Sequence, residues 1–185
     1  MAAFVLHIVQ YGNTSVVNKD AEATPTILFM IHPVRRLATS PVKHSKSSPD
    51  CESLIGLSLQ SLDKRDDSWF FIFADGLSIV TESPWRFVTA EGICVTSEDH
   101  GHPFGLPAPV DAAARMLSGT AEQTILSAAI DPLIGDLTIE FTNQIYLQFL
   151  QLSCGYESWR FYAAGTQTIC MGGGGTARFP NPNVP

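Results

Sequence analysis

Alternating hydrophobic and polar positions predict short β-strands in the middle of the chain. Residues 57–62 alternate in this way, and residues 69–73 (Trp-Phe-Phe-Ile-Phe) are apolar at every position. The pair Asp75-Gly76 favours a tight turn, because both residue types tolerate the backbone angles of a short hairpin loop. Residues 77–81 (Leu-Ser-Ile-Val-Thr) are predicted to be the returning strand, so the pattern predicts a β-hairpin.

A second series of the same kind follows in the C-terminal half of the chain. Residues 124–130, 137–141 and 145–152 are each predicted to be strands, and residues 142–144 form the turn between the last two. The strand predicted at residues 168–171 is the last, because the four glycines after it favour a flexible exit. Hairpins that follow one another along the chain favour antiparallel pairing.

Two helices are predicted, one ahead of each series of strands. Residues 110–117 contain Asp111 near the helix start and three alanines, which favour helix, and Gly119 is expected to end it. Residues 50–55 have the pattern of a shorter helix that ends at Gly56. The expected fold class is therefore α+β: strand-rich, with two pseudo-repeated antiparallel β units, each preceded by a short helix.

A repeated motif supports the two-unit interpretation. Residues 85–87 (Trp-Arg-Phe) are followed by Ile-Cys at 93–94, and residues 159–161 (Trp-Arg-Phe) by Ile-Cys at 169–170. Such a repeat indicates two similar halves packed on one core. Matching positions predict that both cysteines are small buried core residues, and their spacing does not decide whether they form a disulfide. Because we find no secretory signal, we expect reduced thiols and a cytoplasmic location.

The domain organisation is expected to change at residue 50. Residues 1–50 are predicted to be an N-terminal extension and linker, with strand patterns at 3–11 and 26–31 followed by a stretch rich in Ser, Lys, Pro and His. The sequence leaves open whether this part is an added arm, a weakly ordered extension, or upstream sequence that follows from a wrongly assigned start codon. Residues 51–185 are predicted to be a single α+β domain. The two halves of this domain are residues 51–98 and 110–175.

The charge is distributed unevenly along the 185 residues, which carry −7 in total. Residues 1–50 hold five basic and three acidic residues, a charge of +2, and the other six basic and fifteen acidic residues give −9. Because an acidic body repels phosphate backbones, we expect a basic protein partner and no nucleic acid. The same charge also fits a body that uses it only for solubility. No segment is long and apolar enough for us to expect a membrane span.

Several motifs together resemble a known group of proteins. The loop at residues 153–159 reads Ser-Cys-Gly-Tyr-Glu-Ser-Trp and follows a strand of the form Asp-Leu-x-Ile-x-Phe at residues 136–141. The middle of the chain adds Ser-Glu-Asp-His-Gly at residues 97–101. With these motifs, residues 51–175 resemble a family of small bacterial proteins of unassigned function, which are similar to the immunity proteins that accompany secreted toxins. The resemblance implies a non-catalytic protein-binding module that neutralises a toxin.

Six residues in two segments are the predicted partner contacts. Aromatic and charged side chains on loops are typical anchors of protein interfaces. The candidates are Asp99, His100, Phe104, Tyr156, Glu157 and Arg160. The alternative for the second segment is purely structural, with Trp159 in the core and Glu157 holding a turn, because large aromatic residues are usually packing residues.

Two other functions stay open. A metal-dependent enzyme would use His100 and His102 with Asp99 as ligands, although the glycine and proline of this segment favour a loop. A structural module would associate through exposed edge strands, for example as a homodimer. Cys154 with His100 would be a nucleophile and its base, but nothing in the sequence orients that base. We therefore expect no catalytic residues, no cofactor and no resident metal.

Overall fold

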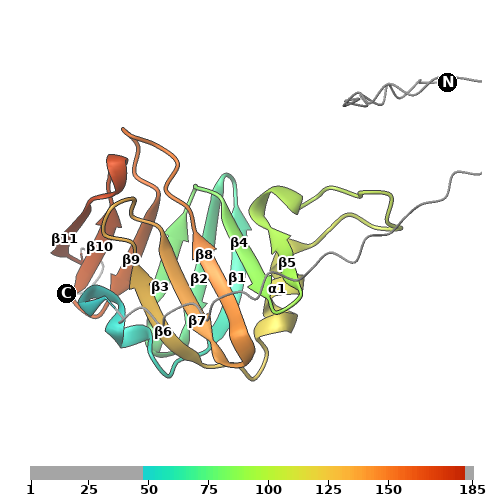
Figure 1. Ribbon diagram of the computed structural model, residues 1–185, viewed down its shortest axis with the longest axis horizontal. Helices are drawn as coiled ribbons and strands as arrows, with labels where there is room; N and C mark the ends of the chain where they lie inside the picture. The colour runs from blue at the N-terminus through green and yellow to red at the C-terminus, as the bar shows by residue number, and fades with distance from the viewer. Residues whose placement is uncertain (1–47, 182–185) are drawn as a thin grey trace, which may run out of the picture. The chain divides into compact units, whose positions relative to one another are not determined.

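Two antiparallel β-sheets make up most of residues 48–181, the part of the chain that this computed structural model describes (Figure 1). The strands predicted at residues 3–11 and 26–31 lie outside the described residues. The first sheet consists, in spatial order, of β1 (Leu59–Arg65), β2 (Ser68–Phe73), β3 (Ser78–Thr81), β9 (Trp159–Ala163), β10 (Thr166–Cys170) and β11 (Thr176–Pro180). The second sheet consists of β5 (Gly92–Thr96), β4 (Trp85–Thr89), β8 (Ile145–Phe149), β7 (Leu137–Phe141) and β6 (Ile125–Ile130).

Short helices connect the strands. The α-helix, α1 (Ala112–Thr120), begins where the carboxylate of Asp111 accepts the N–H of Ala114 at 3.0 Å. The 3-10 helices are η1 (Pro49–Leu54), η2 (Ala74–Gly76), η3 (Ser97–Asp99), η4 (Thr142–Gln144) and η5 (Gly172–Gly174). The expected α+β class is thus confirmed in its general form, a strand-rich antiparallel fold with one α-helix. Within residues 48–181, no helix has the length and apolar character needed to cross a membrane.

The core lies between the two sheets and is largely aromatic. In β2, Trp69, Phe71 and Phe73 are at most 3% exposed, whereas the residues between them are only partly buried. The ring of Phe71 packs edge-on against Trp85 of β4 and Phe149 of β8, with centroid separations of 5.4 and 4.9 Å. Burying each such side chain stabilises the fold by about 1.5–3 kcal/mol, so these contacts hold the two sheets together.

Each sheet combines strands from both halves of the chain. The first sheet joins β3 to β9, with Thr81 opposite Trp159. The second sheet joins β4 to β8, with Trp85 opposite Phe149. Neither half therefore completes a sheet with its own strands alone.

The helical segments cover one edge of each sheet. Along β6, the N–H of Ser48 donates to the carbonyl oxygen of Ala128 at 2.9 Å, and the N–H of Gly56 donates to that of Ile125 at 2.8 Å. At the edge of the first sheet, α1 packs against β1. A covered edge does not pair readily with a strand of another molecule.

Three details of the sequence prediction are wrong. Gly119 does not end α1 but lies inside it. A Cβ at this position would be 2.6 Å from the ring of Phe87, so glycine here allows the helix to pack closely against that ring. The strand that ends at Cys170 is not the last, since η5 leads into β11. Cys94 is exposed whereas Cys170 is buried, and both are free thiols.

The two tryptophans of the repeated motif share their burial but not their polar contacts. Trp85 and Trp159 are both 0% exposed, and each is the first residue of its strand. The Nε1 of Trp159 donates to the carbonyl oxygen of Gly135 at 2.9 Å. Among the described residues, the Nε1 of Trp85 has no hydrogen-bond partner. Both residues fill the core, and Trp159 in addition holds the loop between β6 and β7.

We expect Trp159→Phe to destabilise the protein more than Trp85→Phe. Both substitutions remove a similar volume from the core, but only the first breaks an indole hydrogen bond and leaves a buried carbonyl without this donor, which costs about 1–3 kcal/mol. Urea unfolding of the two variants measures the difference. Equal losses would show that the hydrogen bond to Gly135 contributes nothing.

Candidate functional site

The first group of predicted contact residues lies in the segment after β5. The Asp99 carboxylate accepts the N–H of Thr96 at 2.8 Å and completes a capping box at η3. The His100 ring packs edge-on against Trp69, with 5.1 Å between centroids, and its Nδ1 accepts the N–H of Ala112 at 3.2 Å. Both side chains therefore fix the local backbone and the start of α1.

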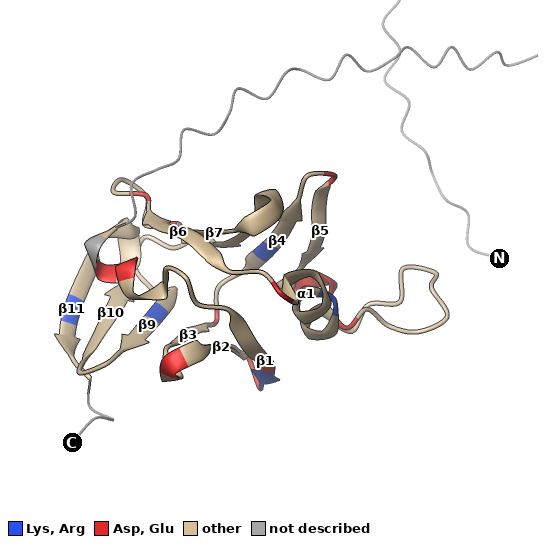
Figure 2. Ribbon diagram, turned by 90° about the horizontal axis from the view of Figure 1, so that it is seen from below, with Lys and Arg blue, Asp and Glu red and all other residues tan. Residues whose placement is uncertain are grey.

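Phe104, the third member of this group, lies on an exposed loop. Residues 101–109 extend from the body in both views (Figures 1 and 2). Phe104 is 66% exposed, and its ring lies 5.6 Å from that of His102. The N–H of Gly101 donates to the carbonyl oxygen of Val110 at 2.8 Å, and the N–H of Val110 donates to that of His102 at 2.9 Å. These bonds close the base of the loop.

The structure does not assemble Asp99, His100 and His102 into a metal site. Among the described residues, no group of three or more His, Cys, Asp and Glu side chains is placed to hold a metal ion. Asp99 Oδ2 and His100 Nδ1 each accept a backbone N–H instead, and His102 faces Phe104. These contacts give the metal-dependent alternative no geometric support in this segment.

The second group of predicted contact residues lies in the loop before β9 and at the start of that strand. Tyr156 is 81% exposed. Arg160 donates to the Glu157 carboxylate from both Nε and a terminal nitrogen, at 3.0 and 2.6 Å, and this bonding raises the pKa of Arg160. The loop of residues 101–109 lies at the other side of the body (Figures 1 and 2). The six candidates therefore form two separate surfaces.

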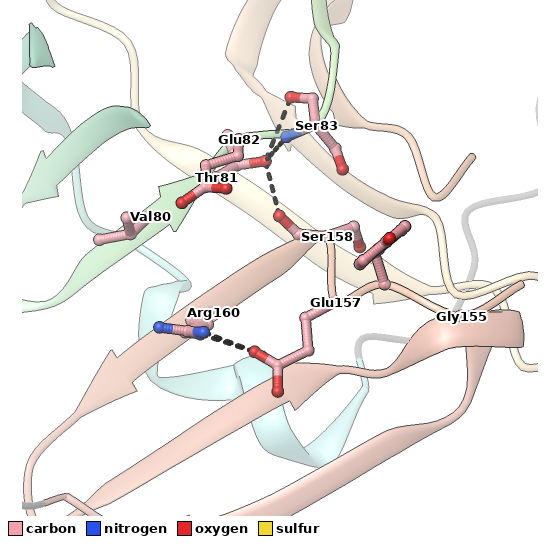
Figure 3. Close-up of a pocket in the computed structure, with 9 residues that line it drawn as sticks. Val80, Thr81, Glu82, Ser83, Gly155, Glu157, Ser158 and Arg160 are labelled. Carbon is pink, nitrogen blue, oxygen red and sulfur yellow. Dashed lines mark hydrogen bonds and ion pairs between the residues drawn. The ribbon is translucent and has the colours of Figure 1, made fainter. Parts of the chain in front are cut away.

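A depression of about 590 Å³ lies beside the second group (Figure 3). In its buried floor, the Thr81 hydroxyl donates to the carbonyl oxygen of Ser158 at 2.9 Å and accepts the N–H of Ser83 at 3.0 Å. These bonds tie together the two connections that pass between the sheets. The exposed side chains of Glu82, Tyr156 and Glu157 line its opening. The sequence analysis missed Glu82, because only the β3–β9 pairing brings it to the same depression as Tyr156.

The chemistry of this depression suits binding of a cationic or amphipathic group. Glu82 contributes a carboxylate that accepts the Ser68 hydroxyl at 3.3 Å, and Tyr156 contributes an aromatic ring with a hydroxyl. The one basic residue in its lining, Arg160, is already paired with Glu157. Such a set attracts positive charge and offers apolar contact area at the same place.

A second depression, of about 540 Å³, lies on the outer face of the second sheet. Glu140 is only 7% exposed there and accepts the Ser127 hydroxyl at 3.0 Å. Burial, followed by the neighbouring Glu140 carboxylate, raises the pKa of Tyr146. The sequence analysis missed this depression, because polar residues alternating along a strand predict an ordinary solvent-facing side. The one available signal was the glutamate inside the apolar run of β7.

No protein-family model, curated protein or solved structure matches this chain. The resemblance to immunity-type proteins stays a hypothesis that rests on the motifs themselves.

We expect maleimide at neutral pH to label Cys94 and Cys154 in the folded protein, and Cys51 and Cys170 only after unfolding. Cys94 and Cys154 are exposed, whereas burial and then the nearby Asp50 raise the pKa of Cys51 from 9.0 to about 12. The fold favours the neutral Cys51 thiol, so its contribution to stability is complete below pH 9.0 and is lost as the pH rises towards about 12.

Mass spectrometry of labelled peptides measures the order of modification. Rapid labelling of Cys51 in the folded protein at pH 9 would contradict this account of its burial.

Proposed function

We propose that this chain is a non-catalytic binding protein that sequesters a basic protein partner, as an immunity protein does with a toxin. The observation that carries the proposal is the depression lined by the exposed Tyr156 together with Glu82 and with the Glu157–Arg160 ion pair. Tyrosine is a frequent anchor of protein interfaces, because it offers a large rigid surface and a hydrogen-bonding hydroxyl.

The charge of the body supports a basic partner. Of the 11 basic and 18 acidic residues of the chain, five basic and two acidic residues lie in residues 1–47, which leaves six and sixteen for residues 48–181 (Figure 2). Three of these six basic residues already form ion pairs with carboxylates. The acidic surplus produces a field that accelerates association with a positively charged protein and weakens as salt is added.

The test is to co-express the chain with each protein encoded next to it, to measure complex formation by calorimetry, and to measure protection by growth where that protein is toxic. We expect a complex whose dissociation constant rises with salt concentration, and rises at least about tenfold on Tyr156→Ala, which is ~1.4 kcal/mol. Asp75→Asn is the matched surface control, because Asp75 lies in the turn at the opposite end of β3. Absence of a complex, or equal effects of both substitutions, would contradict the proposal.

We also propose that the two halves of the body are copies of one unit that exchange strands. The β1–β2 and β6–β7 pairs both carry an irregularity, after Leu59 and after Ile125, and Leu59 lies opposite Phe73 as Ile125 lies opposite Phe141. The N–H of Ala74 donates to the carbonyl oxygen of Ser58 at 3.1 Å, and the N–H of Thr142 donates to the carbonyl oxygen of Thr124 at 2.9 Å. Repeated irregularities support common origin more strongly than repeated strands do, because strands are common in any sheet.

The turns η2 and η4 test this equivalence. Their middle residues Asp75 and Asn143 both have φ near 60°, and the next residues, Gly76 and Gln144, have φ of 74° and 58°. If the turns are equivalent, Gln144→Gly stabilises the protein by roughly 1 kcal/mol and Gly76→Gln destabilises it similarly, because a side chain is strained at these angles. Urea unfolding measures both, and a destabilising Gln144→Gly would contradict the equivalence.

A further inference from the structure

Three loops meet at one end of the two sheets, at the upper left of Figure 1. They are residues 131–136 between β6 and β7, residues 150–158 between β8 and β9, and residues 171–175 between β10 and β11. The N–H of Gln151 donates to the Asp136 carboxylate at 2.8 Å, and its side-chain amide donates to the carbonyl oxygen of Met171 at 2.8 Å. One glutamine therefore joins all three loops.

Glycines allow these loops to touch through their backbones. A Cβ on Gly174 would lie 2.5 Å from the carbonyl carbon of Ile134, and a Cβ on Gly172 would lie 2.5 Å from that of Gly155. The N–H of Gly173 donates to the carbonyl oxygen of Ser153 at 2.9 Å. Backbone contacts this close leave little freedom for the loops to move apart, so the end is preorganised.

The surface of this three-loop end is apolar. Its large exposed side chains and their exposed fractions are Leu133 (81%), Tyr156 (81%), Leu152 (69%), Ile134 (47%) and Met171 (37%). Exposed leucine is common singly, but several large apolar side chains on adjoining loops mark an interaction surface.

The charges around this surface indicate the kind of partner. The charged residues of the three loops are Asp131, Asp136 and Glu157, and all are acidic. Because Glu157 is paired with Arg160 of β9, Asp131 and Asp136 supply the negative charge of this border. The Asp131 carboxylate also accepts the N–H groups of Leu133 and Ile134, at 2.8 and 3.1 Å, and so holds the tip of its loop. An apolar centre with an acidic border is complementary to an apolar anchor with basic neighbours.

We propose that the three-loop end is the docking surface for a basic polypeptide segment that places a leucine or tryptophan side chain among Leu133, Leu152 and Tyr156. This inference rests on the proposed function and extends the contact area beyond the depression at Tyr156. The competing apolar loop, residues 101–109, is bonded mainly to itself, and within residues 48–181 a Cβ on Gly101 or Gly105 would have no neighbour within 4 Å, so this loop offers less preorganised area.

The test uses a defined peptide and the full-length protein with labelled methyl groups. The peptide is seven residues long and amidated, with a Leu-Trp-Leu centre and two lysines at each end. We expect it to shift the methyl signals of Leu133, Ile134, Leu152 and Met171, with a dissociation constant on the order of 1 mM or lower. A peptide with glutamates in place of the lysines, and one with three alanines at the centre, should each bind at least about tenfold more weakly.

Two pairs of variants make the result specific. The double variant Leu133→Ser/Leu152→Ser should weaken binding about tenfold, whereas Leu126→Ser, at a 51% exposed position on β6, should not. Gly174→Ala should also weaken binding because its Cβ would push residues 131–136 away, whereas Gly175→Ala, with open space around its Cβ, should not. No methyl shifts, or shifts centred on the loop of residues 101–109, would overturn the inference.

The same variants separate this inference from the proposed function. If the complex with the partner forms and the Leu133→Ser/Leu152→Ser variant binds it as tightly as the original chain, the docking surface is wrong and the proposed function stands. If no partner complex forms but the lysine peptide binds at the three-loop end, the proposed function is wrong and the surface stands.

Discussion

The pairing of β3 with β9 and of β4 with β8 is the constraint on which the rest of the structure depends. It places Thr81 opposite Trp159 and Trp85 opposite Phe149, so each sheet closes only with strands from both halves of the chain. The aromatic inner faces then have a single partner surface to pack against. Both pairings join residues far apart in sequence. The chain must therefore lose the conformational entropy of closing long loops before burial of the core stabilises it.

The same pairing of strands from both halves determines where the candidate binding surface lies. The connections from β3 to β4 and from β8 to β9 pass between the sheets at one end of the strands. This brings Glu82 and Tyr156 to one depression, and the neighbouring loops pack against each other at Gly172 and Gly174. Scaffold and surface are therefore two consequences of one topology. Each sheet closes only with strands from both halves, and the loops at one end of these strands carry exposed apolar side chains and two aspartates.

The candidate residues differ in how far their roles follow from local sequence. Asp99 has a role that is visible locally, since a carboxylate three residues after a threonine suits a capping box. His100 contacts Trp69, thirty-one positions away in the chain, so its structural role is not readable from its neighbours. Tyr156 and Glu157 are recognisable as a polar-aromatic loop, whereas Leu133, Leu152 and Met171 look like ordinary strand-end residues until three loops are brought together.

The amino-acid sequence by itself determined strands β1–β3, β6–β8 and β10, the turns at η2 and η4, and the antiparallel class, because alternation and turn chemistry are local properties of a few neighbouring residues. It also determined the acidic character of the body and the repeated Trp-Arg-Phe motif. Tertiary structure alone decided which strands pair across the halves, why Gly119 lies within α1, that β11 follows the glycine run, and that Cys94 faces outward. Each of these depends on contacts between segments distant in the chain, and such contacts have no local signature.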